Sequence, residues 1–188
     1  AALLWWATGV WARLDTGPLW GQYNRLFPVK LVVRGLATEL QSGGAPEEVT
    51  EVDPRAHRWR PFVQFSNDMA RTARQFGQTL ARLDDEHNRR RGEKFATGLP
   101  TGDDAEKSME RFQTHFLGYI EQSGDLSGCS PCLRLVDIQR DPYRIGLTEA
   151  GLEFAALQNP LIDTDEPTQA LSKDERTWYL KYVKSEVP

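Results

Sequence analysis

Residues 132–157 read CLRLVDIQRDPYRIGLTEAGLEFAAL, and this stretch decides the fold that we expect. Apolar and polar residues alternate on both sides of QRDPY, a segment with Pro142 that is typical of a turn. Thr148 then stands before EAGLEFAAL, where its hydroxyl can cap the first N–H groups of a helix. The stretch therefore predicts a β-hairpin over about 132–148 that leads directly into a helix.

Most of the remaining chain has the spacing of helices. The longest helix is expected at about 61–91, where apolar residues recur in steps of three and four over about three and a half heptads. A helix at about 104–122 follows, with Asp103 and Glu106 in the positions of a capping box. Further helices are expected at 3–14, at 28–40, after Pro46 and after Ser172, which caps the last helix with Glu175 in the box position. These patterns predict a fold that is mainly α with a small antiparallel β-hairpin.

The composition is that of an ordinary folded protein, but its charge is uneven. The chain has 188 residues, a formal net charge of −4, 39% hydrophobic residues and 27% charged residues. Residues 55–94 hold ten Arg and Lys against five Asp and Glu, a net charge of +5, whereas residues 145–188 hold four against eight. A basic segment in an acidic chain indicates either a face that binds anions or a solvated, charged helix surface.

The segment YRIGLTEAG at 143–151 resembles the end of the wing in winged helix-turn-helix regulators of the MarR and PadR types. Here two residues separate the Tyr-Arg pair from the Leu-Thr pair, where the family pattern has one. The resemblance implies that Thr148 caps the last helix of the domain and that Gly151 lets this helix pack closely against the strand. It also implies a winged-helix-like fold in which the long helix at 61–91 is an insertion.

On this resemblance we expect two parts in the chain. Residues 1–160 would form the winged-helix-like helical domain, and residues 161–188 would form an acidic linker and a C-terminal helix. The chain begins without Met, so we expect a processed chain or a piece of a longer protein or complex. No apolar run reaches the roughly 20 residues that span a bilayer, so we expect a cytoplasmic protein with no membrane partner.

The resemblance implies a non-enzymatic module that binds DNA or another nucleic acid. Its wing would offer Arg134, Arg140 and Arg144 to a minor groove or to phosphates, with Arg140 at the tip. The long helix and the loop after it would contact backbone phosphates through Arg71, Arg74, Arg82, Arg89, Arg90, Arg91 and Lys94. The alternative for each of these arginines is a plain surface charge or an ion pair with a neighbouring acid.

A protein-interaction scaffold with the same fold is the alternative function. Trp5, Trp6 and Trp11 lie close together near the start of the chain, and clustered tryptophans anchor either a core or a partner surface. The heptad-like face of the helix at 61–91 can likewise pack inside the molecule or pair with a second copy of the chain. Binding to a protein partner, or a homodimer, therefore stays open.

We predict no catalytic residue, no cofactor and no metal site. Cys129 and Cys132 in CSPC would need two more ligands for a structural zinc, and the three histidines are scattered without ligand spacing. The pair stands before a strand, whereas a thioredoxin-type redox pair opens a helix after one. The motifs of serine hydrolases, zinc proteases and dinucleotide-binding enzymes are not in the sequence.

Overall fold

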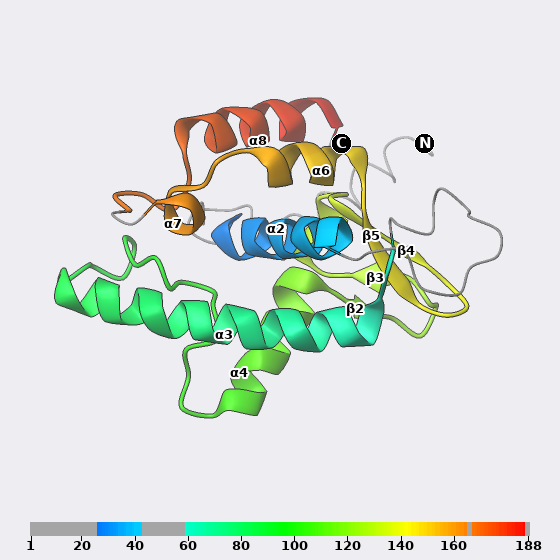
Figure 1. The fold of residues 1–188 in the computed structure, drawn as a ribbon, viewed down its shortest axis with the longest axis horizontal. Coiled ribbons are helices and arrows are strands. Elements are labelled where there is room, and N and C mark those ends of the chain that lie inside the picture. The colour runs from blue at the N-terminus through cyan, green and yellow to red at the C-terminus, as the bar shows by residue number, and fades with distance from the viewer. Residues whose placement is uncertain (1–25, 43–58, 165–166, 187–188) are drawn as a thin grey trace, which may run out of the picture.

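The computed structural model describes residues 26–42, 59–164 and 167–186 (Figure 1). Helices dominate these residues, and the strands form two small antiparallel sheets. The predicted fold class, mainly α with a small antiparallel β-hairpin, is therefore confirmed. The helices expected at 3–14 and after Pro46 lie outside the described residues.

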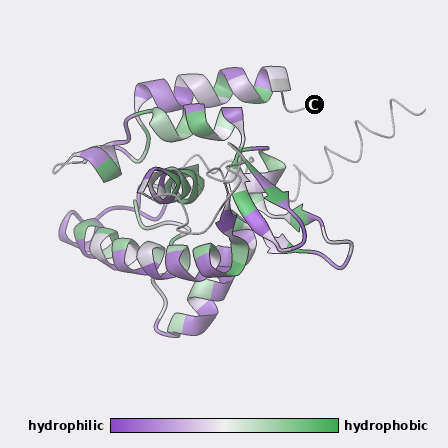
Figure 2. Cartoon of the chain, turned by 45° about the vertical axis from the view of Figure 1, so that its right-hand side comes forward, coloured by the Kyte–Doolittle hydropathy of each residue, from purple (hydrophilic) through white to green (hydrophobic). Residues whose placement is uncertain are grey.

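The helix α2 (Leu26–Ser42) is the centre of the fold. Its residues from Leu26 to Val33 are all buried, and Phe27, Val29 and Val32 are fully so, as expected of a helix in a core. The helices lie in a stack in the order α8 (Lys173–Glu186), α6 (Glu149–Ala156), α2, α3 (Phe62–Glu86) and α4 (Ala105–Phe112) (Figure 1). In Figure 2, α2 is seen nearly end-on with the other elements around it.

The heptad-like face of α3 packs inside the molecule. Phe65, Met69, Ala73 and Leu80 are buried in the same core as α2. Because these side chains already contact the rest of the chain, they are not available to pair with a second copy. Of the two possibilities that the spacing allowed, packing inside the molecule and pairing with a second copy, the structure shows the first.

The end of α3 was predicted too late, at 91 instead of Glu86. Asn88 has a φ of 50°, in the left-handed region, and its N–H bonds to the carbonyl of Asp85. The N–H of Arg89 bonds to the carbonyl of Asp84 at 2.9 Å. These two bonds form a Schellman motif, which ends a helix and turns the chain away from its axis.

The helix predicted at 104–122 is also shorter. Its N-cap is Asp104, not Asp103, and the Asp104 carboxylate accepts the N–H of Lys107 at 3.0 Å. After α4 the chain makes one π-helical turn, η3 (Gln113–Leu117), and leaves the helix at Gly118. A hairpin of β2 (Tyr119–Ile120) and β3 (Leu126–Ser127) takes the place of the predicted last turns.

The predicted hairpin is present and belongs to a three-stranded sheet. Its strands are β4 (Val136–Gln139) and β5 (Arg144–Leu147), with Ile138 opposite Ile145. A short strand before α3, β1 (Arg60–Pro61), pairs with the other edge of β5. CSPC forms a four-residue helix, α5 (Cys129–Cys132), ahead of the hairpin.

The junction between the hairpin and α6 is formed as the sequence predicts. The Thr148 hydroxyl accepts the N–H of Gly151 at 3.0 Å and caps the helix. A Cβ placed on Gly151 would lie 1.9 Å from the carbonyl oxygen of Leu135, which no side chain tolerates. The close approach of α6 to the chain entering β4 therefore requires a glycine here.

α8 is joined to the core by a buried ion pair. Lys30 of α2 and Glu175 of α8 are both fully buried, and Lys30 Nζ lies 3.0 Å from Glu175 Oε1. Burial lowers the pKa of Lys30, while the Glu175 carboxylate opposes that shift. Glu175 also forms the predicted capping box with Ser172, whose backbone N–H it accepts at 2.8 Å. This ion pair joins the parts of the chain before and after residue 161. The short helix α7 (Pro160–Asp163) connects α6 to α8 across that position.

Candidate nucleic-acid interface

The loop after α3 is held in shape by one buried carboxylate. Asp84 is fully buried near the end of α3, and its two oxygens accept the N–H groups of Phe95 and Ala96, each at 2.9 Å. Arg89 Nε lies 3.5 Å from the same carboxylate. Asp84 therefore folds residues 89–96 back onto the helix.

Arg89 is fixed in this loop by a second contact. Its guanidinium lies over the Phe95 ring, 3.9 Å from the ring centroid, and only 20% of the side chain is exposed. The planar guanidinium is thus held flat against an aromatic face before any ligand arrives. Its Nη atoms make no hydrogen bond to any described residue.

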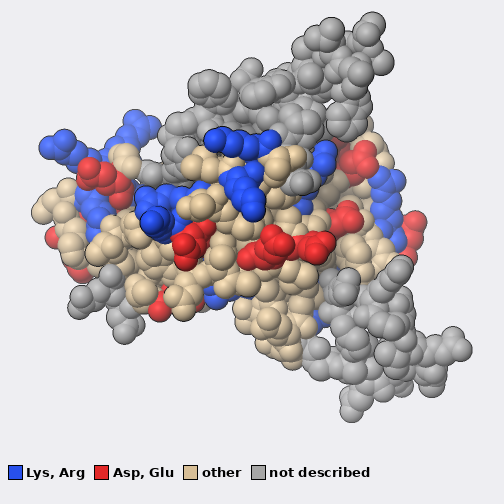
Figure 3. Space-filling model, turned by 90° about the horizontal axis from the view of Figure 1, so that it is seen from above, with Lys and Arg blue, Asp and Glu red and all other residues tan. Residues whose placement is uncertain are grey.

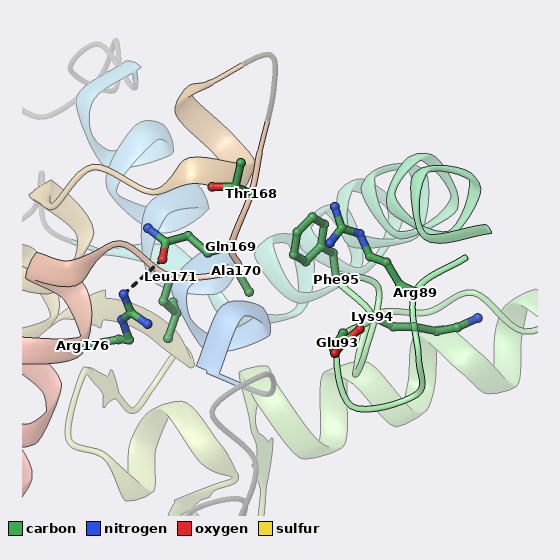
Figure 4. Close-up of a pocket in the computed structure, with 9 residues that line it drawn as sticks. All are labelled: Arg89, Glu93, Lys94, Phe95, Thr168, Gln169, Ala170, Leu171 and Arg176. Carbon is green, nitrogen blue, oxygen red and sulfur yellow. Dashed lines mark hydrogen bonds between the residues drawn. The ribbon is translucent and has the colours of Figure 1, made fainter. Parts of the chain in front are cut away.

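The loop forms one wall of a hollow that we call the basic pocket. Its volume is about 360 Å³, and its charged lining residues are Arg89, Glu93, Lys94 and Arg176. Figure 4 shows Arg89 and Phe95 on one side and Arg176 on the other, with Gln169 accepting from Arg176 at 3.0 Å. Arg176 is a site residue that the sequence analysis missed, because it belongs to the segment judged acidic as a whole.

Arg176 also belongs to a row of cations on the outer face of α8, which we call the α8 stripe. Its members are exposed and recur at spacings that place them on one side of a helix: Lys173, Arg176, Lys181 and Lys184. Figure 3 looks onto this side of the molecule and shows basic side chains along it, with acidic ones beside them. The helical spacing was the signal that could have revealed the stripe.

Two further cations stand in the loop beside the pocket. Arg90 and Arg91 are exposed, and neither forms an ion pair with a described residue. Lys94 pairs with Asp85 at 3.3 Å, but both side chains are exposed. Exposed pairs of this kind contribute about 0–1 kcal/mol, so the Lys94 ammonium can turn to another anion at small cost.

The predicted basic residues within α3 do not gather into one surface. Arg71 pairs with Asp68 on the same helix. Arg74 donates to the carbonyl of Gly102 at 2.9 Å and to Ser108 Oγ at 3.1 Å, so it holds the chain between α3 and α4. Arg82 is exposed and its Nε lies 3.4 Å from the carbonyl of Gln78.

The arginines of the hairpin stand among acids. Arg140 at the turn pairs with Asp125 at 2.5 Å, and both side chains are exposed. Arg134 lies at the entry to the hairpin with a φ of 53°, and it lines a hollow of about 350 Å³ together with Asp125 and Asp137. Arg144 is in β5, opposite Gln139. The hairpin as a whole is therefore close to electrically neutral.

The structure separates the hairpin from the basic pocket. β5 pairs with β1, which leads into the first residue of α3, whereas the pocket follows the last turn of α3 (Figure 1). A helix of 25 residues is about 37 Å long at 1.5 Å per residue. α8 runs between the two ends, because the Tyr182 hydroxyl near its end donates to the carbonyl of Leu133 at 3.0 Å.

The remaining candidates from the sequence are the cysteine pair, a metal site and the tryptophans. Cys129 is buried and Cys132 exposed, and both are thiols. In the described ranges, no three potential metal ligands lie together. No helix in the same ranges has the length and hydrophobicity to cross a membrane. Trp5, Trp6 and Trp11 lie outside these ranges.

Comparisons with known proteins do not change this description. The chain matches no protein-family model, no curated protein and no solved structure. The candidate interface is therefore defined by its geometry and charge: the basic pocket, Arg90 and Arg91 beside it, and the α8 stripe.

Proposed function

We propose that this chain is a non-enzymatic nucleic-acid-binding module that holds backbone phosphates along the α8 stripe and the loop after α3. The observation that carries the proposal is that Arg176 belongs to both the stripe and the basic pocket. Cations from two distant segments thus form one path. A path of exposed cations is the electrostatic footprint of a phosphate-backbone binder.

The dimensions of the path suit several successive phosphates. Lys173 and Lys184 are eleven residues apart on α8, which corresponds to about 16 Å along the helix. Duplex DNA carries one charge per roughly 1.7 Å of its axis, so a path of this length faces several phosphates. Binding would release counterions and weaken with salt, and the acids beside the stripe would orient the strand.

The winged-helix resemblance supports the DNA-binding reading of this surface, and we propose the hairpin as a second contact. The capped α6 and the glycine that admits it to the strand support the resemblance at Thr148 and Gly151. Arg140 would exchange its exposed partner Asp125 for a phosphate. We further propose a cytoplasmic location and membership of a larger protein or complex.

Salt-dependent fluorescence anisotropy with labelled duplex and single-stranded DNA tests the proposal. We expect affinity to fall steeply with salt, with a slope whose magnitude drops by about 2 in an Arg90→Gln/Arg91→Gln variant, about 1 per lost phosphate contact. A Lys181→Gln/Lys184→Gln variant should lose a similar amount.

The matched control is Lys107→Gln/Arg111→Gln, which removes the same charge from the exposed surface of α4. It should leave the salt slope near that of the unsubstituted chain. Equal losses in all three variants would mean that only net charge matters, and the proposed path would be wrong. Absence of binding at low salt would reject the function itself.

A further inference from the structure

The basic pocket differs from the rest of the path because it is concave and its cations are oriented. The three lysines of the α8 stripe, together with Arg90 and Arg91, are exposed side chains on a convex surface outside the pocket lining. In the pocket, Arg89 is held by Phe95 and Asp84, and Arg176 is held by Gln169. The Arg89 guanidinium is thus held in place on one side of the hollow, and Arg176 lies on the other side, where it donates to Gln169 (Figure 4).

The charge of the lining selects among anions. Arg89, Lys94 and Arg176 contribute three positive charges and Glu93 one negative charge, a net of +2. A phosphodiester in the middle of a strand carries one negative charge. A phosphomonoester carries nearly two at neutral pH, since its second pKa is about 6, and it offers three terminal oxygens.

Arginine is also the side chain that suits such a group. Its planar fork donates two parallel hydrogen bonds to two oxygens of one phosphate, and a fork that is already fixed loses little side-chain entropy on binding. The unused Nη atoms of Arg89 are donors of this kind. A hollow of about 360 Å³ lies within the usual range for small-ligand sites and has room for the sugar that carries the phosphate.

We propose that the basic pocket binds a phosphomonoester dianion, and that its carrier is the phosphorylated end of a nucleic-acid strand lying on the α8 stripe. The choice of carrier rests on the proposed function, whereas the preference for a monoester rests on the pocket. Arg89, fixed on Phe95, donates the paired hydrogen bonds to the phosphate, and Arg176 adds positive charge from the other side of the hollow. The Lys94 ammonium leaves Asp85 and adds a further positive charge beside the phosphate.

The test compares one oligonucleotide with a 5′-phosphate, with a 3′-phosphate and with hydroxyls at both ends, in anisotropy titrations of the whole chain. We expect one of the phosphorylated forms to bind at least about tenfold tighter than the hydroxyl form, as two added charge-assisted hydrogen bonds would give. This advantage should fade as the pH falls below about 6, where the monoester gains a proton.

Arg176→Gln and Lys94→Gln should remove the advantage, while Arg111→Gln, on the exposed side of α4, should keep it. Both pocket substitutions are at partly or fully exposed side chains, so the fold is retained, which urea unfolding verifies. Equal binding of all three oligonucleotides would overturn this inference and leave the proposed function standing.

Inorganic phosphate and a nucleoside monophosphate serve as the second arm, measured by chemical shifts of the Phe95 and Gly92 amides. Saturable shifts that Arg176→Gln removes, without oligonucleotide binding, would support the monoester site and reject the strand as its carrier. Neither shifts nor oligonucleotide binding would reject both the inference and the proposed function.

Discussion

Among the described glycines, Gly151 has the least room for a side chain. A methyl group there would meet the carbonyl oxygen of Leu135 at 1.9 Å, and backbone cannot move aside as a side chain can. We expect Gly151→Ala to lower the free energy of unfolding in urea by about 3 kcal/mol, at the upper end of overpacking costs. The control is Gly92→Ala, where a Cβ meets nothing within 4 Å. A loss as small as that of the control would contradict the close contact.

Glu39 of α2 gives the fold a pH dependence. Burial raises the pKa of Glu39 above its ordinary 4.5, the charge of Asp68 adds to the rise, and Arg60 opposes it. The folded chain therefore binds the Glu39 proton more tightly than the unfolded chain does. Its contribution to the free energy of unfolding falls as the pH rises from 4.5 through the folded-state pKa.

Replacing Glu39 by Gln removes this dependence. We expect Glu39→Gln to match the unsubstituted chain in urea unfolding near pH 4 and to become the more stable of the two at pH 7. Glu106→Gln, on the exposed side of α4, controls for the loss of one acid. A stability difference that does not change between the two pH values would show that Glu39 does not titrate in this way.

At the scale of the element, the loop after α3 depends on Asp84. Asp84→Asn leaves one oxygen for two N–H groups, turns an amide toward the other, and removes the charge facing Arg89. We expect a loss of about 1–3 kcal/mol in the free energy of unfolding. Faster hydrogen exchange at the Phe95 and Ala96 amides should accompany it.

The neighbouring acid supplies the comparison for that substitution. Asp85 is 76% exposed and pairs only with the exposed Lys94 among the described residues. Asp85→Asn should therefore change stability by less than about 1 kcal/mol and leave both amides protected. Similar effects of the two substitutions would mean that the buried carboxylate does not hold the loop.

The elements predicted from the sequence are those with local signals. The hairpin followed from alternation and a turn, and the caps at Thr148 and Ser172 followed from residues that bond within three positions. The ends of the helices predicted at 61–91 and 104–122 were placed too late because no local pattern in the sequence marks them. Asn88 ends α3 by bonding to the turn before it, and Gly118 ends the helical segment after α4 where it packs against β3, and helical periodicity contains neither contact.

The candidate site was harder to predict than the fold. The sequence drew attention to the cations at 89–94, but not to Arg176, which reaches the same hollow from a distant segment. It also placed Arg74 among the phosphate contacts, although its guanidinium holds the chain near Gly102. A basic residue that binds a ligand and one that holds a loop look alike in sequence.

At the scale of the whole molecule, α3 is about 37 Å long and leads from the sheet that holds the hairpin to the basic pocket, which makes a prediction about duplex length. One turn of duplex DNA is about 34–36 Å, so only a duplex of about 11 base pairs or more reaches both ends. We expect Arg140→Gln to weaken the binding of a 16-base-pair duplex and to leave that of an 8-base-pair duplex unchanged. Isothermal titration at fixed salt measures both.

Arg90→Gln/Arg91→Gln should weaken the binding of the two duplexes alike, and it is the reference for that comparison. If Arg140→Gln has no effect on either duplex, the hairpin is not a second contact, and the path along α8 acts alone. If it weakens both equally, the short duplex binds at the hairpin instead of at the pocket.

Because Asp84 holds the loop after α3, the backbone course of this loop does not depend on the side chains that it exposes. The course of the loop is fixed by the Asp84 side chain within α3 and by two backbone N–H groups, which every residue except proline has. The side chains at the tip of the loop, including those of Arg90 and Arg91, take no part in these contacts. New side chains can therefore be presented at these positions on an unchanged scaffold, so binding preference can diverge here while the architecture is inherited intact.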